Sequence, residues 1–171
     1  MSVRLIIDPI DFVQNAGVRH GKIPVIDLVR LHDLLFDKEG ELIYQISGRF
    51  DKNAKPGLQL EVKGKIHLSC QRCLEKLVCK IDLKTFLLLA KNEIELQQVD
   101  EDDTIDAILA TPDLDVINLI EDEVILGLSI SSCHADGECN PLKLKSATDN
   151  LASKNQSANP FAVLATLKKT H

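Results

Sequence analysis

Four side chains in two short clusters could bind a metal ion. Cys70 and Cys73 are separated by two residues, and His134 and Cys139, separated by four, follow in the last third of the chain. A Cys-x2-Cys pair usually supplies half of a tetrahedral zinc site, and a histidine with a cysteine can supply the other half. The spacing therefore predicts a structural zinc site. Cys133, beside His134, is a competing ligand.

Other interpretations of the cysteines remain open. Reduced thiols at a strand turn behave as small hydrophobic side chains. A redox dithiol at Cys70 and Cys73 is less compatible with the pattern, because such pairs usually open a helix and this pair follows a long strand. A catalytic zinc ion is less compatible still, because four protein ligands close the coordination shell. Cys79 lies within the next strand, where we expect a structural role.

A small set of basic residues could contact RNA. Lys63, Lys65 and Arg72 come from an alternating strand and the turn after it, and could form a basic patch on a sheet face. Arg49, Lys52 and Lys55 of the preceding strand and turn could join them. Ordinary solubilising charge is at least as good an explanation, because Asp51 and Glu61 are interleaved with this wider set and no stacking aromatic side chains accompany it. The chain has a net charge of −6, whereas a general nucleic-acid binder has an excess of Lys and Arg. Any RNA contact would therefore be local or made through a partner.

The sequence offers no set of catalytic residues. Glu121, Asp122 and Glu123 fall within a predicted helix, and solvated carboxylates are a simpler interpretation than a catalytic pair, because nothing nearby supplies a nucleophile or a second acid. The sequence also lacks a phosphate-binding glycine loop, a nucleophile elbow and a His-Glu-x-x-His motif. We therefore expect a protein that is not an enzyme.

Composition predicts one domain with a tail. The chain has 171 residues, of which 44% are hydrophobic and only 4% aromatic, so we expect an aliphatic core. No apolar run is long enough for a transmembrane helix. Asp8 and Pro9 interrupt the N-terminus too early for a secretory signal. The five cysteines are an odd number, which argues against a disulfide framework. We therefore expect a cytoplasmic protein.

The elements that must position these residues are mainly strands. Residues 41–50, 58–68 and 77–90 are predicted as long strands, and residues 21–26 as a shorter one. The strand at 58–68 alternates almost strictly between apolar and polar residues, which is typical of a half-buried strand. The Cys-x2-Cys segment follows this strand, so the pattern predicts a zinc-knuckle hairpin.

Helices should cover the sheet. One helix is predicted from Pro9 to a stop at Gly17, a second begins at Asp27, and a third spans residues 112–128. The second helix would place four leucines on one face: Leu28, Leu31, Leu34 and Leu35. We expect an α+β domain of residues 1–140, with an antiparallel sheet, open or barrel-like, whose face the helices cover. The acidic stretch 91–106 is expected to be a solvated loop.

The C-terminal region should be a separate flexible tail. Residues 141–158 are rich in Ser, Ala, Asn, Lys and Gln and are predicted to be a flexible linker. Residues 159–171 should form a short helical motif, which is marginal alone in water and so should dock on a partner. The expected partner-binding residues are Asn159, Pro160, Phe161, Leu164 and Leu167.

Three segments together resemble a known family. They are Leu68–Leu74 around the two cysteines, Ile120–Leu126 before the His/Cys pair, and Asn159–Lys168 in the tail. In their order and spacing the chain resembles the YceD family, the large ribosomal RNA subunit accumulation proteins. One departure concerns Leu128–His134, which contains no proline, whereas relatives similar to the enterobacterial protein are proline-rich there. The path into the metal cluster should thus be less rigid.

The resemblance implies a bacterial factor for the synthesis, processing or stability of 23S rRNA in large-subunit biogenesis. It implies ribosome-assembly or rRNA-processing proteins as partners, with the 23S rRNA precursor contacted directly or indirectly. It implies no known catalytic activity, and we expect neither a membrane nor a small-molecule substrate as partner. The alternative is a metal-dependent RNA-processing enzyme, which would need an open coordination position or an acid–base pair.

Overall fold

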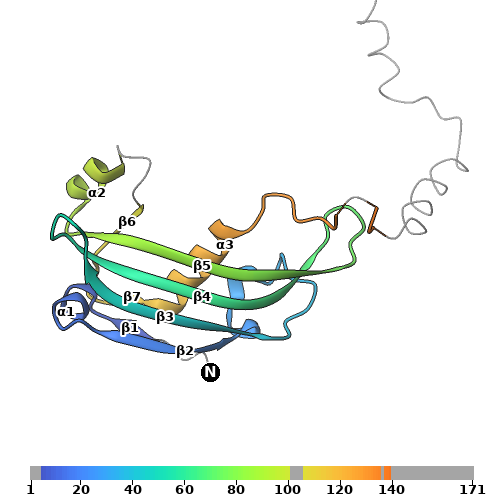
Figure 1. Cartoon of the computed structure of the whole chain (residues 1–171), viewed down its shortest axis with the longest axis horizontal. Helices are drawn as coiled ribbons and strands as arrows, with labels where there is room; N and C mark the ends of the chain where they lie inside the picture. Colours follow the sequence, from blue (N-terminus) through green and yellow to red (C-terminus); the bar gives the residue numbers. More distant parts are fainter. Residues whose placement is uncertain (1–4, 101–105, 136, 140–171) are drawn as a thin grey trace, which may run out of the picture. The chain divides into compact units, whose positions relative to one another are not determined.

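A five-stranded sheet is the main element of the computed structural model, which describes residues 5–100, 106–135 and 137–139 (Figure 1). The chain divides into two compact units, residues 1–133 and residues 134–171. The predicted linker and C-terminal motif lie outside the described residues. The sheet has the order β2-β3-β4-β5-β6, and its strands are β2 (Val18–Pro24), β3 (Glu41–Phe50), β4 (Pro56–Ser69), β5 (Lys76–Ala90) and β6 (Asp106–Leu109).

The pairing of the strands corrects the expected architecture in two respects. Strands β2 to β5 pair with their neighbours in antiparallel fashion, as predicted, but β6 runs parallel to β5. The sheet is therefore mixed, and the barrel-like alternative is wrong because β2 and β6 remain as edges. A second sheet of two short strands pairs β1 (Ile6–Ile7) with β7 (Leu114–Asp115). The fold is mostly β-sheet with few helices.

Alternation along the strands defines the two faces of the large sheet. The inner face of β4 carries five buried side chains: Leu58, Leu60, Val62, Ile66 and Leu68. Leu42, Tyr44 and Ile46 of β3 are buried on the same face. Because neighbouring residues point to opposite faces, the polar residues between them form the outer face. The half-buried strand predicted from the alternation of residues 58–68 is confirmed.

Two helices pack against the inner face. Helix α1 (Pro9–Gln14) begins as predicted, because the Asp8 side chain caps it by accepting from the backbone N–H groups of Ile10 and Asp11. Helix α3 (Val116–Gly127) contributes buried residues to the same core. At Gly48 of β3, an added Cβ would lie 2.6 Å from the Cα of Val13, so only glycine allows α1 this close approach.

The helix predicted from Asp27 is wrong. The segment forms two short 3₁₀ turns instead, Val25–Asp27 and Val29–Leu31. Leu28 and Leu31 are fully buried, and their spacing of three matches the period of a 3₁₀ turn. Burial of these two leucines against the sheet, rather than helix propensity, decides the local structure.

Two further element boundaries differ from the prediction. Helix α3 begins at Val116 rather than at residue 112, because Leu114 and Asp115 pair with β1 and the Asp115 side chain then caps the helix at Ile117 N. Residues 91–106 were expected as a loop but contain helix α2 (Glu93–Asp100), whose Glu95 N–H donates to the Asn92 side chain. No helix in the described part of the chain is long and apolar enough to cross a membrane.

Candidate metal centre

The turn between β4 and β5 presents Cys70 and Cys73. Cys70 N donates to Glu75 O at 2.9 Å and Leu74 N donates to Cys70 O at 2.8 Å, so backbone hydrogen bonds close the turn. Both cysteines are buried. Leu74 has a φ of +60°, a left-handed conformation that costs a side-chain-bearing residue about 1–2 kcal/mol. The turn is therefore held in a strained geometry that keeps its two thiols together.

A backbone hydrogen bond brings the chain after α3 to this turn. Gln71 N donates to Ser132 O at 3.0 Å. Ser132 stands two residues before His134 in the sequence. The Cys139 Sγ in turn lies 4.0 Å from His134 Nδ1. The backbone hydrogen bond from Gln71 thus brings Ser132, which is far away in the sequence, to the cysteine turn.

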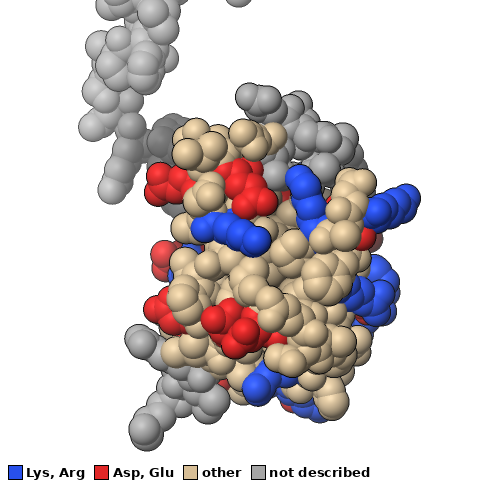
Figure 2. Space-filling model, turned by 90° about the vertical axis from the view of Figure 1, so that its left-hand side faces the viewer, with Lys and Arg blue, Asp and Glu red and all other residues tan. Residues whose placement is uncertain are grey.

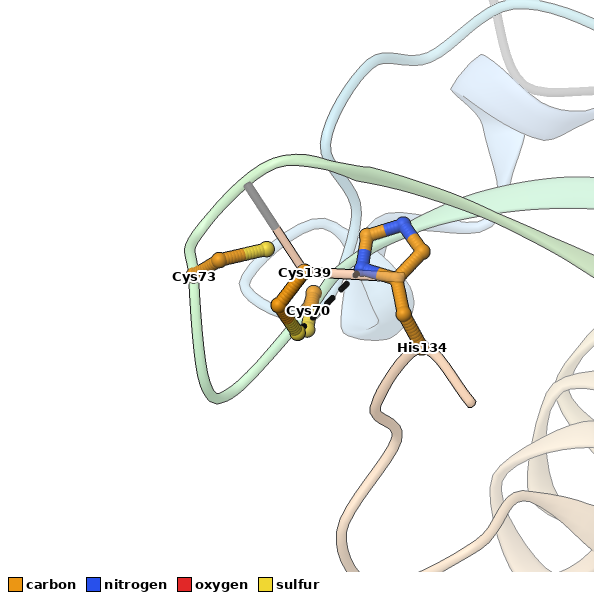
Figure 3. A group of neighbouring side chains, drawn as sticks. All are labelled: Cys70, Cys73, His134 and Cys139. Carbon is orange, nitrogen blue, oxygen red and sulfur yellow. Dashed lines mark hydrogen bonds between the residues drawn. The ribbon is translucent and has the colours of Figure 1, made fainter. Parts of the chain in front are cut away.

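The four predicted ligands form one group (Figure 3). The ligand atoms of Cys70, Cys73, His134 and Cys139 all lie within 4.8 Å of one another. A zinc ion with bonds of about 2.3 Å to sulfur would need separations of roughly 3.7 Å, so small side-chain movements suffice. Three thiols and an imidazole are a donor set that zinc prefers in structural sites. This group could hold a metal ion.

Cys133 is not part of this group. Its Sγ lies 3.5 Å from Ser131 Oγ, and among the described residues the group of neighbouring ligand atoms includes His134 but not Cys133. Cys79 is half-buried within β5, and burial raises the pKa of its thiol. The geometry therefore favours the ligand set with Cys139 over one with Cys133.

The acidic residues of α3 have structural partners. We expected Glu121 to be solvated, and this is wrong: it is only 3% exposed, and its Oε1 accepts from the backbone N–H of Arg30 at 2.6 Å. Asp122 pairs with the Arg30 guanidinium. Glu123 is half-buried, and burial raises the pKa of its carboxyl, an effect that the nearby Asp106 and Asp122 increase. The first two carboxylates fasten α3 to the 3₁₀ segment.

A charged network next to the turn was not foreseen from the sequence. Asp37 Oδ1 lies 2.7 Å from His67 Nδ1, and its Oδ2 lies 2.8 Å from Lys76 Nζ. The hydrogen bonds from Lys76 and then His67 lower the pKa of Asp37 to about 2. The network ties the segment before β3 to β4 and β5, the two strands that flank the cysteine turn.

The remaining predicted site residues lie in different places. Lys63 and Lys65 are exposed on the outer face of β4, whereas Arg72 lies in the cysteine turn beyond that face. The predicted partner-binding residues from Asn159 to Leu167 lie outside the described residues. The structure therefore describes the setting of the metal and RNA predictions but not that of the tail.

Comparison with known proteins identifies one family. The family model of the large ribosomal RNA subunit accumulation protein YceD matches residues 58–168. The match begins in β4 and includes both cysteine-containing segments and the tail motif. No solved structure matches the chain.

Proposed function

Because the chain belongs to the YceD family of large ribosomal RNA subunit accumulation proteins, we propose that it is a non-enzymatic factor for the synthesis, processing or stability of 23S rRNA. The family name supports a role in accumulation of the large-subunit RNA. The observation that supports the non-enzymatic part is the Cys3His group, whose four protein side chains could together supply a complete tetrahedral shell to a zinc ion. Such a shell leaves no position for a reactive water.

The proposed metal is a structural zinc ion. When bound, it would cross-link Cys70 and Cys73 of the turn to His134 and Cys139 by four ligand bonds. Structural zinc sites contribute directly to folding free energy, because the ligands are not assembled in the unfolded chain. The strained Leu74 is consistent with this role, since the bound metal would offset the backbone cost of the turn.

Substitution of the ligands tests this proposal. We expect Cys70→Ser/Cys73→Ser to lose bound zinc, to unfold at lower urea concentration, and to restore 23S rRNA poorly in cells that lack the protein. Cys79→Ser is the matched control, because this thiol lies outside the group. It should keep zinc and support normal rRNA levels. The structural-zinc proposal would be contradicted if wild-type protein restores 23S rRNA in these cells but is recovered from them without bound metal.

The enzyme alternative requires a different result. Purified protein incubated with precursor 23S rRNA should leave the RNA uncleaved, with or without added zinc. Cleavage that Cys70→Ser abolishes but Cys79→Ser preserves would instead support a metal-dependent RNA-processing enzyme.

The tail is the proposed contact with partner proteins in ribosome assembly. Phe161, Leu164 and Leu167 would supply the apolar face that a short helix buries against a partner. We expect deletion of residues 159–171 to reduce both partner recovery in pull-downs and 23S rRNA accumulation while zinc content stays normal. Unchanged recovery and rRNA levels would refute this assignment.

A further inference from the structure

The outer face of the large sheet is not covered by helices α1 and α3 or by the 3₁₀ turns. These elements pack on the inner face, as Gly48 shows for α1 and Gly127 shows for α3, where an added Cβ would lie 2.6 Å from the Leu83 side chain. On the opposite face, the side chains of Lys63, Lys80 and Lys84 are between 65% and 75% exposed. Within the part of the chain that the structure describes, these lysines are therefore accessible to a large ligand.

Positive charge is concentrated on this outer face. The strand registers and their alternation place seven cations and three anions there: Lys22, Arg49, Lys63, Lys65, Lys76, Lys80 and Lys84 with Glu41, Glu61 and Asp82. The whole chain has a net charge of −6, so this surface opposes the overall charge. Figure 2, which views the molecule from one end, shows several Lys and Arg along the right-hand edge and others at the centre and the bottom, whereas most Asp and Glu lie at the left and centre.

Two lysines of this face stand directly opposite each other. Lys65 of β4 is the register partner of Lys80 of β5, and like charges in directly opposite positions destabilise a sheet. Among the described residues, Lys65 has no carboxylate within ion-pair distance, and Lys80 reaches only Asp82 at 4.0 Å, which also pairs with Lys63 at 3.6 Å. The repulsion is thus only partly compensated within the described protein.

A hollow lies at this pair of lysines. It has a volume of about 650 Å³ and is lined by residues that include Lys63, Lys65, His67 and Lys80. Gly64 and two acidic residues, Glu41 and Asp82, also line it. Three lysines that line one open hollow could contact several oxygens of an anionic chain at once.

We propose that this outer face, centred on Lys63, Lys65, Lys80 and Lys84, binds the phosphodiester backbone of RNA. The choice of RNA among polyanions rests on the proposed function. Lysine contacts to phosphate are independent of sequence, and the aromatic side chains that would stack on bases are scarce here, with Phe86 half-buried at one end. The face should therefore bind RNA without reading its bases.

Binding of labelled RNA by the purified full-length protein tests the proposal. We expect a labelled oligouridine and a labelled hairpin to bind with similar affinity. Four phosphate contacts predict that log K falls against log salt with a slope of about −3 between about 50 and 200 mM NaCl. Lys65→Gln/Lys80→Gln should weaken binding roughly tenfold or more and reduce the slope by about 1.5.

Folding stability separates a binding role from a structural one. Neutralising the opposed pair removes repulsion, so Lys65→Gln/Lys80→Gln should keep or slightly raise the urea midpoint while it loses affinity. The matched control is Lys55→Gln/Lys91→Gln, which removes the same charge from a turn and from the segment after β5. It should change RNA affinity less than threefold.

The outcomes distinguish this inference from the proposed function. Equal RNA affinity for wild type and Lys65→Gln/Lys80→Gln would overturn the interface, as would polyglutamate competing as well as RNA, which would indicate an acidic protein partner. If wild type fails to bind RNA but restores 23S rRNA in cells, the interface is wrong and the function stands. If it binds RNA as described but its deletion leaves 23S rRNA unchanged, the interface stands and the proposed function fails.

Discussion

Replacement of Glu121 by alanine should destabilise the fold without removing a catalytic group. The buried carboxylate accepts from the backbone N–H of Arg30 at 2.6 Å. A hydrogen bond to a charged group contributes about 1.5–3 kcal/mol, and the removed side chain leaves space in a packed region. We therefore expect Glu121→Ala to lower the free energy of unfolding by about 2–4 kcal/mol. Glu121→Gln keeps an acceptor oxygen and should cost only about 1 kcal/mol.

Urea denaturation at neutral pH, followed by circular dichroism, measures these differences. The neighbouring Asp122→Asn is the control, because its ion pair with Arg30 is about half-exposed and such pairs contribute only about 0.2–1 kcal/mol. A loss below about 1 kcal/mol for Glu121→Ala, or equal losses for alanine and glutamine, would refute the reasoning. Full stability combined with loss of rRNA accumulation would instead indicate a functional carboxylate.

Three further substitutions test other parts of the structure by the same denaturation assay. Asp37→Asn should reduce stability at neutral pH, because Lys76 and His67 lower the pKa of Asp37 from 3.8 to about 2. The difference in stability from wild type should persist above pH 3.8 and disappear as the pH falls through about 2. Glu123→Gln should raise stability by less than about 1 kcal/mol at neutral pH, because burial raises the pKa of this half-buried carboxyl. The gain in stability should vanish when the pH falls below 4.5, the ordinary pKa of a glutamate side chain. Gly48→Val should cost about 1–3 kcal/mol, because any Cβ there meets the backbone of α1; an unchanged urea midpoint would contradict that packing.

The strands could be predicted because the alternation of apolar and polar residues along each strand determines which side chains are buried. Residues 58–68 alternate between apolar and polar, and the structure buries the apolar set on one face. The start of α1 at Asp8 could also be predicted, because an Asp followed by a proline is a typical sequence at a helix N-terminus. The local structure after Asp27 could not be predicted in this way, because four leucines at helical spacing are equally compatible with two buried leucines, one half-buried leucine (Leu35) and one exposed leucine (Leu34). Tertiary burial selected the 3₁₀ turns.

The candidate site was predictable only where spacing alone defines the chemistry. The short interval between Cys70 and Cys73 indicates a pair of ligands in any fold. The role of Glu121 could not be read in this way, because its partner is a backbone N–H that lies 91 positions away. The opposed lysines depend on the register of β4 with β5, which the sequence of each strand does not specify.

Pairing between the ends of the described domain has a consequence for how the protein folds during synthesis. The hairpins of β2 to β5 join neighbouring segments and can form early, whereas β1 must wait for β7, which lies more than a hundred residues later. Contacts between such distant segments form slowly, because a long loop must close first. The nascent chain would therefore leave the ribosome with its sheet assembled and its inner face still open until α3 has been made. During this interval the exposed inner face could bind chaperones. Substitutions that destabilise α3 would then reduce the yield of folded protein.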